Sequence, residues 1–185
     1  EASAIAKLPP NLKDCTLYCT LEPCCHTGKQ PPCTNSIVSC RAISRVVVGV
    51  FDPDTKVAGS GVKQLEEAGI SVSVGVCDTE VKESLKAYIH SRTQNTPYVI
   101  GKIAVSQDNM YCKRGEDVKI TTEIARLHSH KLRATSQAIM VGASTVNIDD
   151  PMLNIRDETC KNHNQPLIAI VDLNNRLNTI LPIYQ

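Results

Sequence analysis

The chain has 185 residues, of which 42% are hydrophobic, and this is enough apolar material for one large packed domain or two small ones. Its formal net charge of +1, with no run of Lys or Arg, argues against a nucleic-acid or membrane partner and favours a small ligand. No apolar stretch has the length of a membrane span and no signal-peptide pattern is present, so we expect a cytoplasmic protein, with import into an organelle left open.

Strand and helix patterns alternate along the first half of the chain. Short runs of β-branched and apolar residues predict strands, and apolar periodicity preceded by Pro, Thr, Asn or Ser predicts helices. The expected strands cover residues 17–21, 45–51 and 70–76, and the expected helices cover residues 32–42, 62–68 and 80–90. This alternation favours an α/β layered fold with a largely parallel sheet.

A polar stretch at residues 91–97 has the composition of a linker, and we place a domain boundary there. The expected domains are therefore residues 1–93 and residues 94–185. The second half again combines strands with a helix, and no internal repeat relates it to the first half. Its expected strands cover residues 98–105, 138–141 and 167–171, and its expected helix covers residues 122–134.

Nine cysteines are present, and five of them lie between residues 15 and 33. An odd number cannot form a complete disulfide framework, so metal-binding thiols in a reducing compartment fit better. Cys24 and Cys33 flank a loop rich in Pro and Gly, between a predicted strand end and a predicted helix start. Buried, unreactive thiols are the ordinary interpretation of two cysteines, but this placement favours two ligands of a catalytic zinc.

Zinc-dependent base deaminases carry a His-x-Glu pair that is followed by Pro-Cys and a second Cys. Here residues 20–26, Thr-Leu-Glu-Pro-Cys-Cys-His, and residues 31–33, Pro-Pro-Cys, resemble the bifunctional pyrimidine deaminase-reductase family of riboflavin biosynthesis. Residues 52–53 and 57–61 resemble the next motif of that family. Cys25 stands where the family usually has Ser; we expect it to pack, with competition for the metal left open. The resemblance implies a cytidine-deaminase-like three-layer α/β/α domain.

The same resemblance implies the residues of a deaminase site. Cys24 and Cys33 are expected as zinc ligands, and the third ligand is a His two positions before Glu1. Glu1 itself is expected as the catalytic acid and base, which moves protons while a zinc-activated water displaces an amino group from the ring. His26 and Lys29 are expected to contact a small phosphorylated pyrimidine substrate.

Five later blocks resemble, in order, the reductase half of the same family: residues 102–108, 120–121, 130–134, 141–146 and 149–156. This implies a partial dihydrofolate-reductase-like α/β domain that uses NADPH to reduce the ribosyl chain of the deaminated product. The resemblance also implies two sets of contact residues. They are Ala104, Lys119, Thr145, Asp149 and Leu173 for the cofactor, and Lys102, Asp117, Arg133, Leu153 and Arg156 for the substrate.

Several departures from the family pattern weaken the reductase assignment. Residues 106–110 are Ser-Gln-Asp-Asn-Met in place of Ser-Leu-Asp-Gly-Arg, and Lys119 stands where a Trp is common. Asp117 occupies a position that often carries Ser, and its charge would repel a substrate phosphate. Without the resemblance, Arg133 would be a solvated helix residue and Thr145 a helix cap.

We expect an internal piece of a longer enzyme, with most of the deaminase domain followed by the first half of the reductase domain. A homo-oligomer is left open. One alternative is a deaminase of another nucleotide whose reductase-like domain does not catalyse. The other is an interaction module in which the thiolates of Cys15, Cys19, Cys24 and Cys33 bind a structural zinc.

Overall fold

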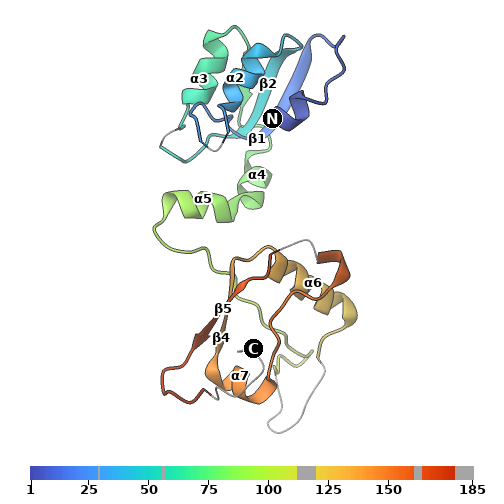
Figure 1. Cartoon of the computed structure of the whole chain (residues 1–185), viewed down its shortest axis with the longest axis vertical. Coiled ribbons are helices and arrows are strands. Elements are labelled where there is room, and N and C mark those ends of the chain that lie inside the picture. The colour runs from blue at the N-terminus through green and yellow to red at the C-terminus, as the bar shows by residue number, and fades with distance from the viewer. Residues whose placement is uncertain (29, 56, 112–119, 161–163, 178–185) are drawn as a thin grey trace. The chain divides into compact units, whose positions relative to one another are not determined.

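The computed structural model describes residues 1–185 except 29, 56, 112–119, 161–163 and 178–185 (Figure 1). The chain divides into two compact units, unit 1 at Glu1–Ile100 and unit 2 at Gly101–Gln185. The domain boundary expected after residue 93 stays a prediction.

Unit 1 is built on a parallel sheet with the strand order β1-β2-β3 among the described residues. The strands are β1 (Cys15–Leu21), β2 (Ile43–Val50) and β3 (Ser71–Val74). The central strand β2 reads as an almost continuous run of valines because both of its faces are covered, as is usual in parallel sheets. The three strands predicted in this half of the chain are all present.

Helices lie on both faces of this sheet. α1 (Ala2–Ile5), α2 (Cys33–Ser39) and α3 (Ser60–Glu67) precede or connect the strands, and α4 (Asp78–Ser84) follows them. One face carries the core cluster, which consists of Ile37, Ile43, Val46, Val48, Leu65 and Ile70, with Ile5 packed against it. On the other face Gly49 lets α4 approach, since a Cβ at this position would lie 2.7 Å from the Val81 side chain. The result is a helix, sheet and helix sandwich (Figure 1).

Two expectations about the middle of the chain are wrong. The single helix expected at residues 80–90 is two helices, α4 and α5 (Lys86–Thr93), which meet at Leu85. α5 also extends into the expected linker. The strand expected at residues 98–105 is not formed, since this segment has no ladder partner among the described residues. Extended backbone becomes a strand only when a neighbour pairs with its N–H and C=O groups, and local sequence does not supply that neighbour.

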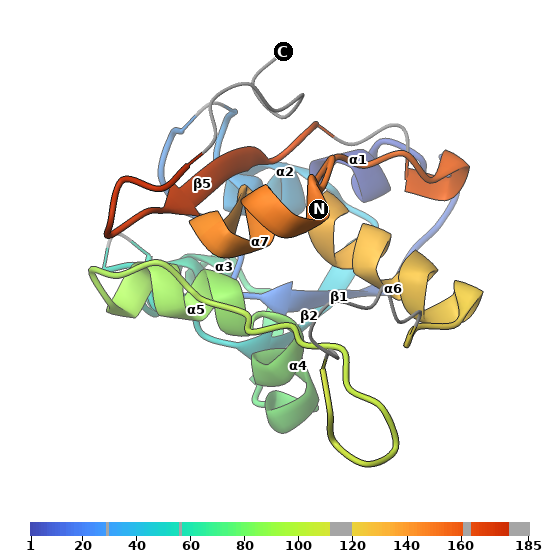
Figure 2. The ribbon, with the colours of Figure 1, turned by 90° about the horizontal axis from the view of Figure 1, so that it is seen from below.

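Unit 2 contains the parallel pair β4 (Ala138–Gly142) and β5 (Leu167–Val171), both at predicted positions. α6 (Glu123–Ala134) begins after Thr122, whose Oγ1 accepts a hydrogen bond from the Ala125 backbone N–H at 3.3 Å. β4 leads directly into α7 (Ala143–Asp149), which was not predicted, and the 3-10 helix η1 (Glu158–Cys160) follows. α6 and α7 form separate helices of this unit (Figures 1 and 2).

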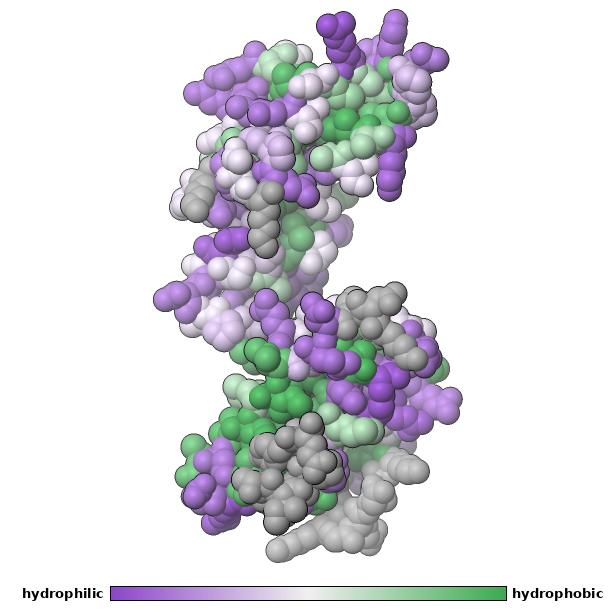
Figure 3. Space-filling view, viewed as in Figure 1, coloured by the Kyte–Doolittle hydropathy of each residue, from purple (hydrophilic) through white to green (hydrophobic). Residues whose placement is uncertain are grey.

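Unit 2 buries few of its large apolar side chains among the described residues. Its buried hydrophobic side chains are Ala143, Val146, Leu153, Ile155 and Cys160. By contrast, Met140 on β4 is 72% exposed and Leu167 on β5 is 76% exposed. Hydrophobic residues gather on the β4 and β5 side of this unit in the space-filling view (Figure 3). Its described part is therefore less completely packed than unit 1.

None of the helices in the described part of the chain is both long enough and apolar enough to cross a lipid bilayer.

The buried carboxylate of Glu22 fastens the end of β1 to a distant loop. Oε2 accepts hydrogen bonds from the backbone N–H groups of Asp52 at 3.2 Å and Gly59 at 2.8 Å. Oε1 accepts from those of Gly61 at 2.9 Å and Val62 at 3.0 Å. Glu22 is only 3% exposed, so water cannot solvate its carboxylate, and these four backbone donors take the place of water.

Glu22→Gln should lower the free energy of unfolding of unit 1 by about 2–4 kcal/mol, because an amide NH₂ cannot accept from two backbone donors and leaves them unpaired. Glu66→Gln, which changes an exposed Glu on α3, is the matched control and should change it by less than about 0.5 kcal/mol. Chemical denaturation followed by circular dichroism measures both. Equal effects of the two substitutions would contradict this role for Glu22.

Candidate functional site

Cys24 and Cys33 are brought together at the turn between β1 and α2. Pro23 is fully buried after the strand, and Pro32, with φ −54°, is the N-cap of α2. The Cys33 backbone N–H donates to the Cys24 sulfur at 3.4 Å, and the Thr34 N–H donates to the Cys24 carbonyl at 3.2 Å. The two thiols therefore lie next to each other although nine residues separate them in sequence.

The carboxyl group of Glu1 lies against this pair of thiols and against Cys19 on β1. Burial raises the pKa of the Cys33 thiol to about 12, and hydrogen bonds to Glu1 and Cys24 add to the effect. Burial and the Glu1 carboxylate likewise raise the pKa of the Cys19 thiol to about 12. The thiols of Cys19, Cys24 and Cys33 thus lie close to the Glu1 carboxyl group.

The donor set at this turn fits part of a zinc site. Two adjacent thiols are soft ligands that zinc prefers, and the charge of a bound cation would favour their thiolate forms. Glu1 lies beside them at a position where it can exchange protons with a ligand. Within the described residues, no three or more His, Cys, Asp and Glu side chains are arranged to hold a metal ion. The four-thiolate arrangement that includes Cys15 is accordingly not formed there.

The loop between the two cysteines presents His26 at the surface. His26 is exposed, and the loop turns where the Gly28 backbone N–H donates to the Gln30 carbonyl at 3.2 Å. Lys29, expected to meet the substrate phosphate, lies outside the described residues. Substrate contacts for both residues stay predictions.

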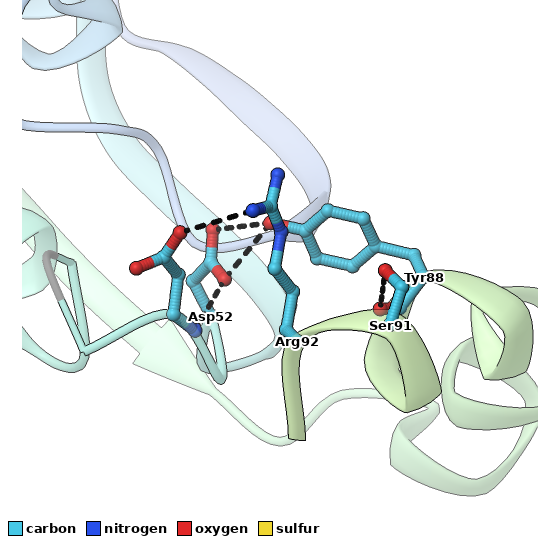
Figure 4. A network of polar contacts seen from close by, with 5 residues as sticks. Asp52, Tyr88, Ser91 and Arg92 are labelled. Carbon is cyan, nitrogen blue, oxygen red and sulfur yellow. Dashed lines mark hydrogen bonds and ion pairs between the residues drawn. The ribbon is translucent and has the colours of Figure 1, made fainter. Parts of the chain in front are cut away.

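A polar network connects α5 to the loop after β2 (Figure 4). The Tyr88 hydroxyl donates to the Asp52 carboxylate, with both oxygens at 3.1 Å. Arg92 pairs with Asp54 at 3.6 Å and lies 5.3 Å from the centre of the Tyr88 ring. Since the Asp52 backbone N–H also donates to Glu22, the network continues to the residue that precedes Pro23 and Cys24.

Tyr88→Phe should destabilise unit 1 by about 1–2 kcal/mol, because it removes the hydroxyl donor from a buried carboxylate. Tyr18→Phe is the control, since the Tyr18 side chain is 74% exposed on β1. Thermal and chemical unfolding of the two variants provide the measurement, and similar losses in both would contradict the prediction.

The same tyrosine makes the stability depend on alkaline pH. Burial and Asp52 raise the pKa of Tyr88 in the folded protein, while Arg92 acts against them. The folded state thus holds this proton more tightly than the unfolded chain. Its contribution is fully present below the ordinary tyrosine pKa of about 10 and is lost as pH rises above it. The Tyr88→Phe variant should lack this loss in unfolding curves measured across that range.

In unit 2, two expected substrate residues, Arg133 and Arg156, converge on one backbone segment. Arg133 Nη1 on α6 donates to the Asn154 carbonyl at 3.3 Å, and Arg156 Nη1 donates to the Asn154 Oδ1 at 3.2 Å. Burial, followed by the neighbouring Arg156, lowers the pKa of Arg133. Two guanidinium groups this close repel each other, and a bound anion would relieve that repulsion.

The chain that carries Arg156 is fixed in shape by local contacts. Leu153 is 7% exposed and adopts the left-handed region with φ 49°. The Gln165 side chain accepts from the Ile155 N–H at 2.7 Å and donates to the Ile155 carbonyl at 2.9 Å. Leu153 is thus held by burial, and its expected contact with substrate stays a prediction.

The expected cofactor residues are spread over several elements. Lys102 is exposed and Ala104 half-buried in the extended segment, while Thr145 and Asp149 are exposed on α7, whose N-cap is Gly142. The alternative of Thr145 as a helix cap is therefore wrong. Among the remaining expected contacts, Leu173 is 89% exposed, and Asp117 and Lys119 lie outside the described residues.

The altered loop at residues 106–110 keeps a tight turn. The Ser106 N–H donates to the Met110 carbonyl at 2.7 Å, and the Met110 N–H donates to Ser106 Oγ at 3.1 Å. Asn109, where the family has Gly, adopts φ 61°. Asn tolerates this left-handed conformation better than most residues, so the substitution is compatible with the turn.

Sequence reasoning gave no role to several residues that the structure connects to these sites. They are Glu22 in the loop anchor, Tyr88 on α5, and His130 near the arginine pair, and Cys19 beside Glu1 was expected only as a ligand of a structural zinc. Glu22 and His130 lie inside quoted motifs, which was a signal that they matter. Helical spacing places His130 one turn before Arg133, but no spacing indicates the other partners, which lie far along the chain or on another element.

Comparison with known proteins finds a different family match in each half of the chain. Residues 1–50 match the zinc-binding region of cytidine and deoxycytidylate deaminases, and residues 97–181 match the RibD C-terminal domain. The riboflavin biosynthesis protein RibD of Chlamydia trachomatis is 41% identical over 174 residues, which cover 93% of this chain and 46% of that protein. The chain belongs to the RibD family. RibD of Escherichia coli is 34% identical over 196 residues, covering all of this chain and 53% of that protein.

Solved RibD structures confirm the fold. One structure of Acinetobacter baumannii RibD has a TM-score of 0.83 at 33% identity and covers 98% of this chain and 52% of that one. A Thermotoga maritima deaminase and reductase has a TM-score of 0.73 at 37% identity and covers 83% and 42%. The expected α/β fold class, a cytidine-deaminase-like domain followed by a reductase domain, is confirmed. The chain spans about half the length of these RibD relatives.

Proposed function

We propose that this RibD chain contributes to two consecutive reactions of riboflavin biosynthesis. The first is hydrolytic deamination of 2,5-diamino-6-(5-phosphoribosylamino)pyrimidin-4-one, and the second is NADPH-dependent reduction of the ribosyl chain to ribityl. The Thermotoga maritima relative is described as a diaminohydroxyphosphoribosylaminopyrimidine deaminase and 5-amino-6-(5-phosphoribosylamino)uracil reductase, which supports the assignment. A small-molecule substrate and a cytoplasmic location go with this proposal, and a homo-oligomer is left open.

The observation that carries the proposal is the convergence of Glu1, Cys24 and Cys33 at one strand, loop and helix turn. The Cys33 N–H on the Cys24 sulfur and the hydrogen bond between the Cys33 thiol and Glu1 connect the three residues. Two thiol ligands beside a carboxyl group that is not a ligand are the arrangement of zinc deaminases of bases. The match of residues 1–50 to a zinc-binding region supports the same metal.

In the deaminase reaction, zinc held by Cys24 and Cys33 would supply the Lewis acid that makes a water nucleophilic at neutral pH. Glu1 takes a proton from the attacking water and delivers it to the departing amine. The exposed loop with His26 and Lys29 holds the phosphorylated end of the substrate. Glu22 keeps the loop from Asp52 to Val62 against the base of the site, so that the turn is rigid.

In the reductase reaction, Arg133 and Arg156 bind the substrate phosphate. Both guanidinium groups donate to Asn154, one to its backbone carbonyl and one to its side chain, so a single residue orients both. Lys102, Ala104, Thr145 and other expected contacts would hold NADPH, whose nicotinamide supplies the hydride. These cofactor contacts are proposed from the family resemblance alone.

A chain with His and Ala added directly before Glu1 should bind one zinc and deaminate the pyrimidine substrate, because three protein ligands are then present. Cys33→Ala in that chain should lose both zinc and activity, whereas Cys77→Ala changes an exposed thiol away from the turn and should keep both. Metal analysis of the purified chain and release of ammonia are the measurements. Full zinc content and activity in Cys33→Ala would overturn the zinc assignment.

The natural protein should bind NADPH and oxidise it when the deaminated substrate is supplied. Arg133→Ala should raise KM for that substrate by about tenfold or more with a smaller effect on NADPH binding, since it removes a phosphate ligand. Arg126→Ala, which changes an exposed arginine on α6, is the control. NADPH consumption gives the rates, and deamination without any NADPH binding or oxidation would favour the alternative of a non-catalytic reductase-like domain.

A further inference from the structure

His130 is buried near Arg133 and Arg156 in unit 2, and the proposed reactions give it no role. It lies on α6 one turn before Arg133, so the two side chains share a helix face. The His130 side chain is 8% exposed, and its Nδ1 has no hydrogen-bond partner among the described residues. A buried polar atom without a hydrogen-bond partner destabilises the fold, so packing alone does not explain an imidazole at a position that an apolar side chain could fill.

The charges around His130 come from both elements that pack at this place. Arg133 lies on α6 itself, and Arg156 and Asp157 lie on the segment that leads into η1. Burial lowers the pKa of His130, the two guanidinium groups lower it further, and Asp157 acts in the opposite direction. The imidazole is therefore neutral near pH 7, and a proton on it would add a third positive charge to the cluster.

We propose that His130 is a positioning residue whose protonation is coupled to the binding of a doubly charged oxyanion at Arg133 and Arg156. The inference rests on the proposed function of these arginines as a phosphate site. In the empty site, a charged His130 is repelled by both guanidinium groups. A bound dianion offsets that repulsion, so anion binding favours the imidazolium form, and the imidazolium form favours anion binding to the same extent.

The sign of the pH dependence follows from this coupling. The bound anion raises the pKa of His130, so binding takes up a proton, and anion affinity increases as pH falls through the pKa of the imidazole. Asp157 does not produce this effect, because hydrogen bonds from Thr159 hold the pKa of Asp157 below its usual value and it stays charged in this range.

Sulfate is the probe of choice, because it remains a dianion over the whole range and inorganic phosphate does not. Sulfate affinity of the 185-residue chain should rise roughly three- to tenfold from about pH 7.5 to about pH 5 at constant ionic strength. His130→Gln should flatten this dependence, while His128→Gln, an exposed histidine on the same helix, should keep it. Arg133→Ala should weaken sulfate binding at every pH.

A second measurement covers the case in which His130→Gln does not fold. Histidine ring signals of the unaltered chain, followed by nuclear magnetic resonance, should show His130 titrating at higher pH with sulfate present and His128 unchanged. Sulfate binding that depends on Arg133 but leaves the His130 titration unmoved would overturn the inference and leave the proposed enzyme function standing. If sulfate shifts the His130 titration but the natural protein has neither deaminase nor reductase activity, the inference stands and the proposed enzyme function is overturned. Absence of sulfate binding at Arg133 would overturn the inference.

Discussion

The fold of unit 1 depends on the carboxylate of Glu22, which accepts four backbone hydrogen bonds from the loop after β2 and the first turn of α3, 30 to 40 residues further along the chain. A carboxylate with this little exposure is stable only because each of its oxygens has two donors. Gly61 makes the close approach possible, since a Cβ there would lie 2.1 Å from the Pro23 carbonyl. The position of Pro23, and with it the start of the cysteine loop, is thereby determined by contacts that lie outside that loop.

From this anchor the structure extends in two directions. Toward the cysteine loop, the backbone of Cys33 and Thr34 closes onto Cys24, which places two thiols beside Glu1. Toward α5, the Asp52 side chain accepts from Tyr88, so a helix with no buried residue is attached by polar contacts rather than by an apolar face. This anchoring fits the proposed zinc site, in which Cys24, Cys33 and Glu1 would be held in fixed relation to one another.

Unit 2 shows a different balance, with a charged cluster on a small apolar core. Arg133 and Arg156 are fixed by a shared asparagine, and His130 lies next to them with a buried nitrogen that no described residue satisfies. Like charges held in proximity destabilise a fold unless a ligand compensates them, and such arrangements are common where proteins bind anions. The local geometry of this cluster fits the anion site proposed at Arg133 and Arg156.

Much of this could be predicted from the sequence, because strands, helices and the Pro-Cys turns are local patterns. The three strands of unit 1, α6 with its Thr122 cap, and the parallel pair of unit 2 lie where the apolar periodicity placed them. The segment at residues 98–105 was predicted wrongly, since pairing depends on a neighbour that periodicity does not reveal. By itself the sequence determined the strands of the two sheets, several of the helices, the pair of thiols and the family. Only the tertiary structure decided that Glu22 anchors the Asp52 loop, that Tyr88 faces Asp52 and that Arg156 comes near His130 and Arg133, because those contacts join groups that lie far apart along the chain.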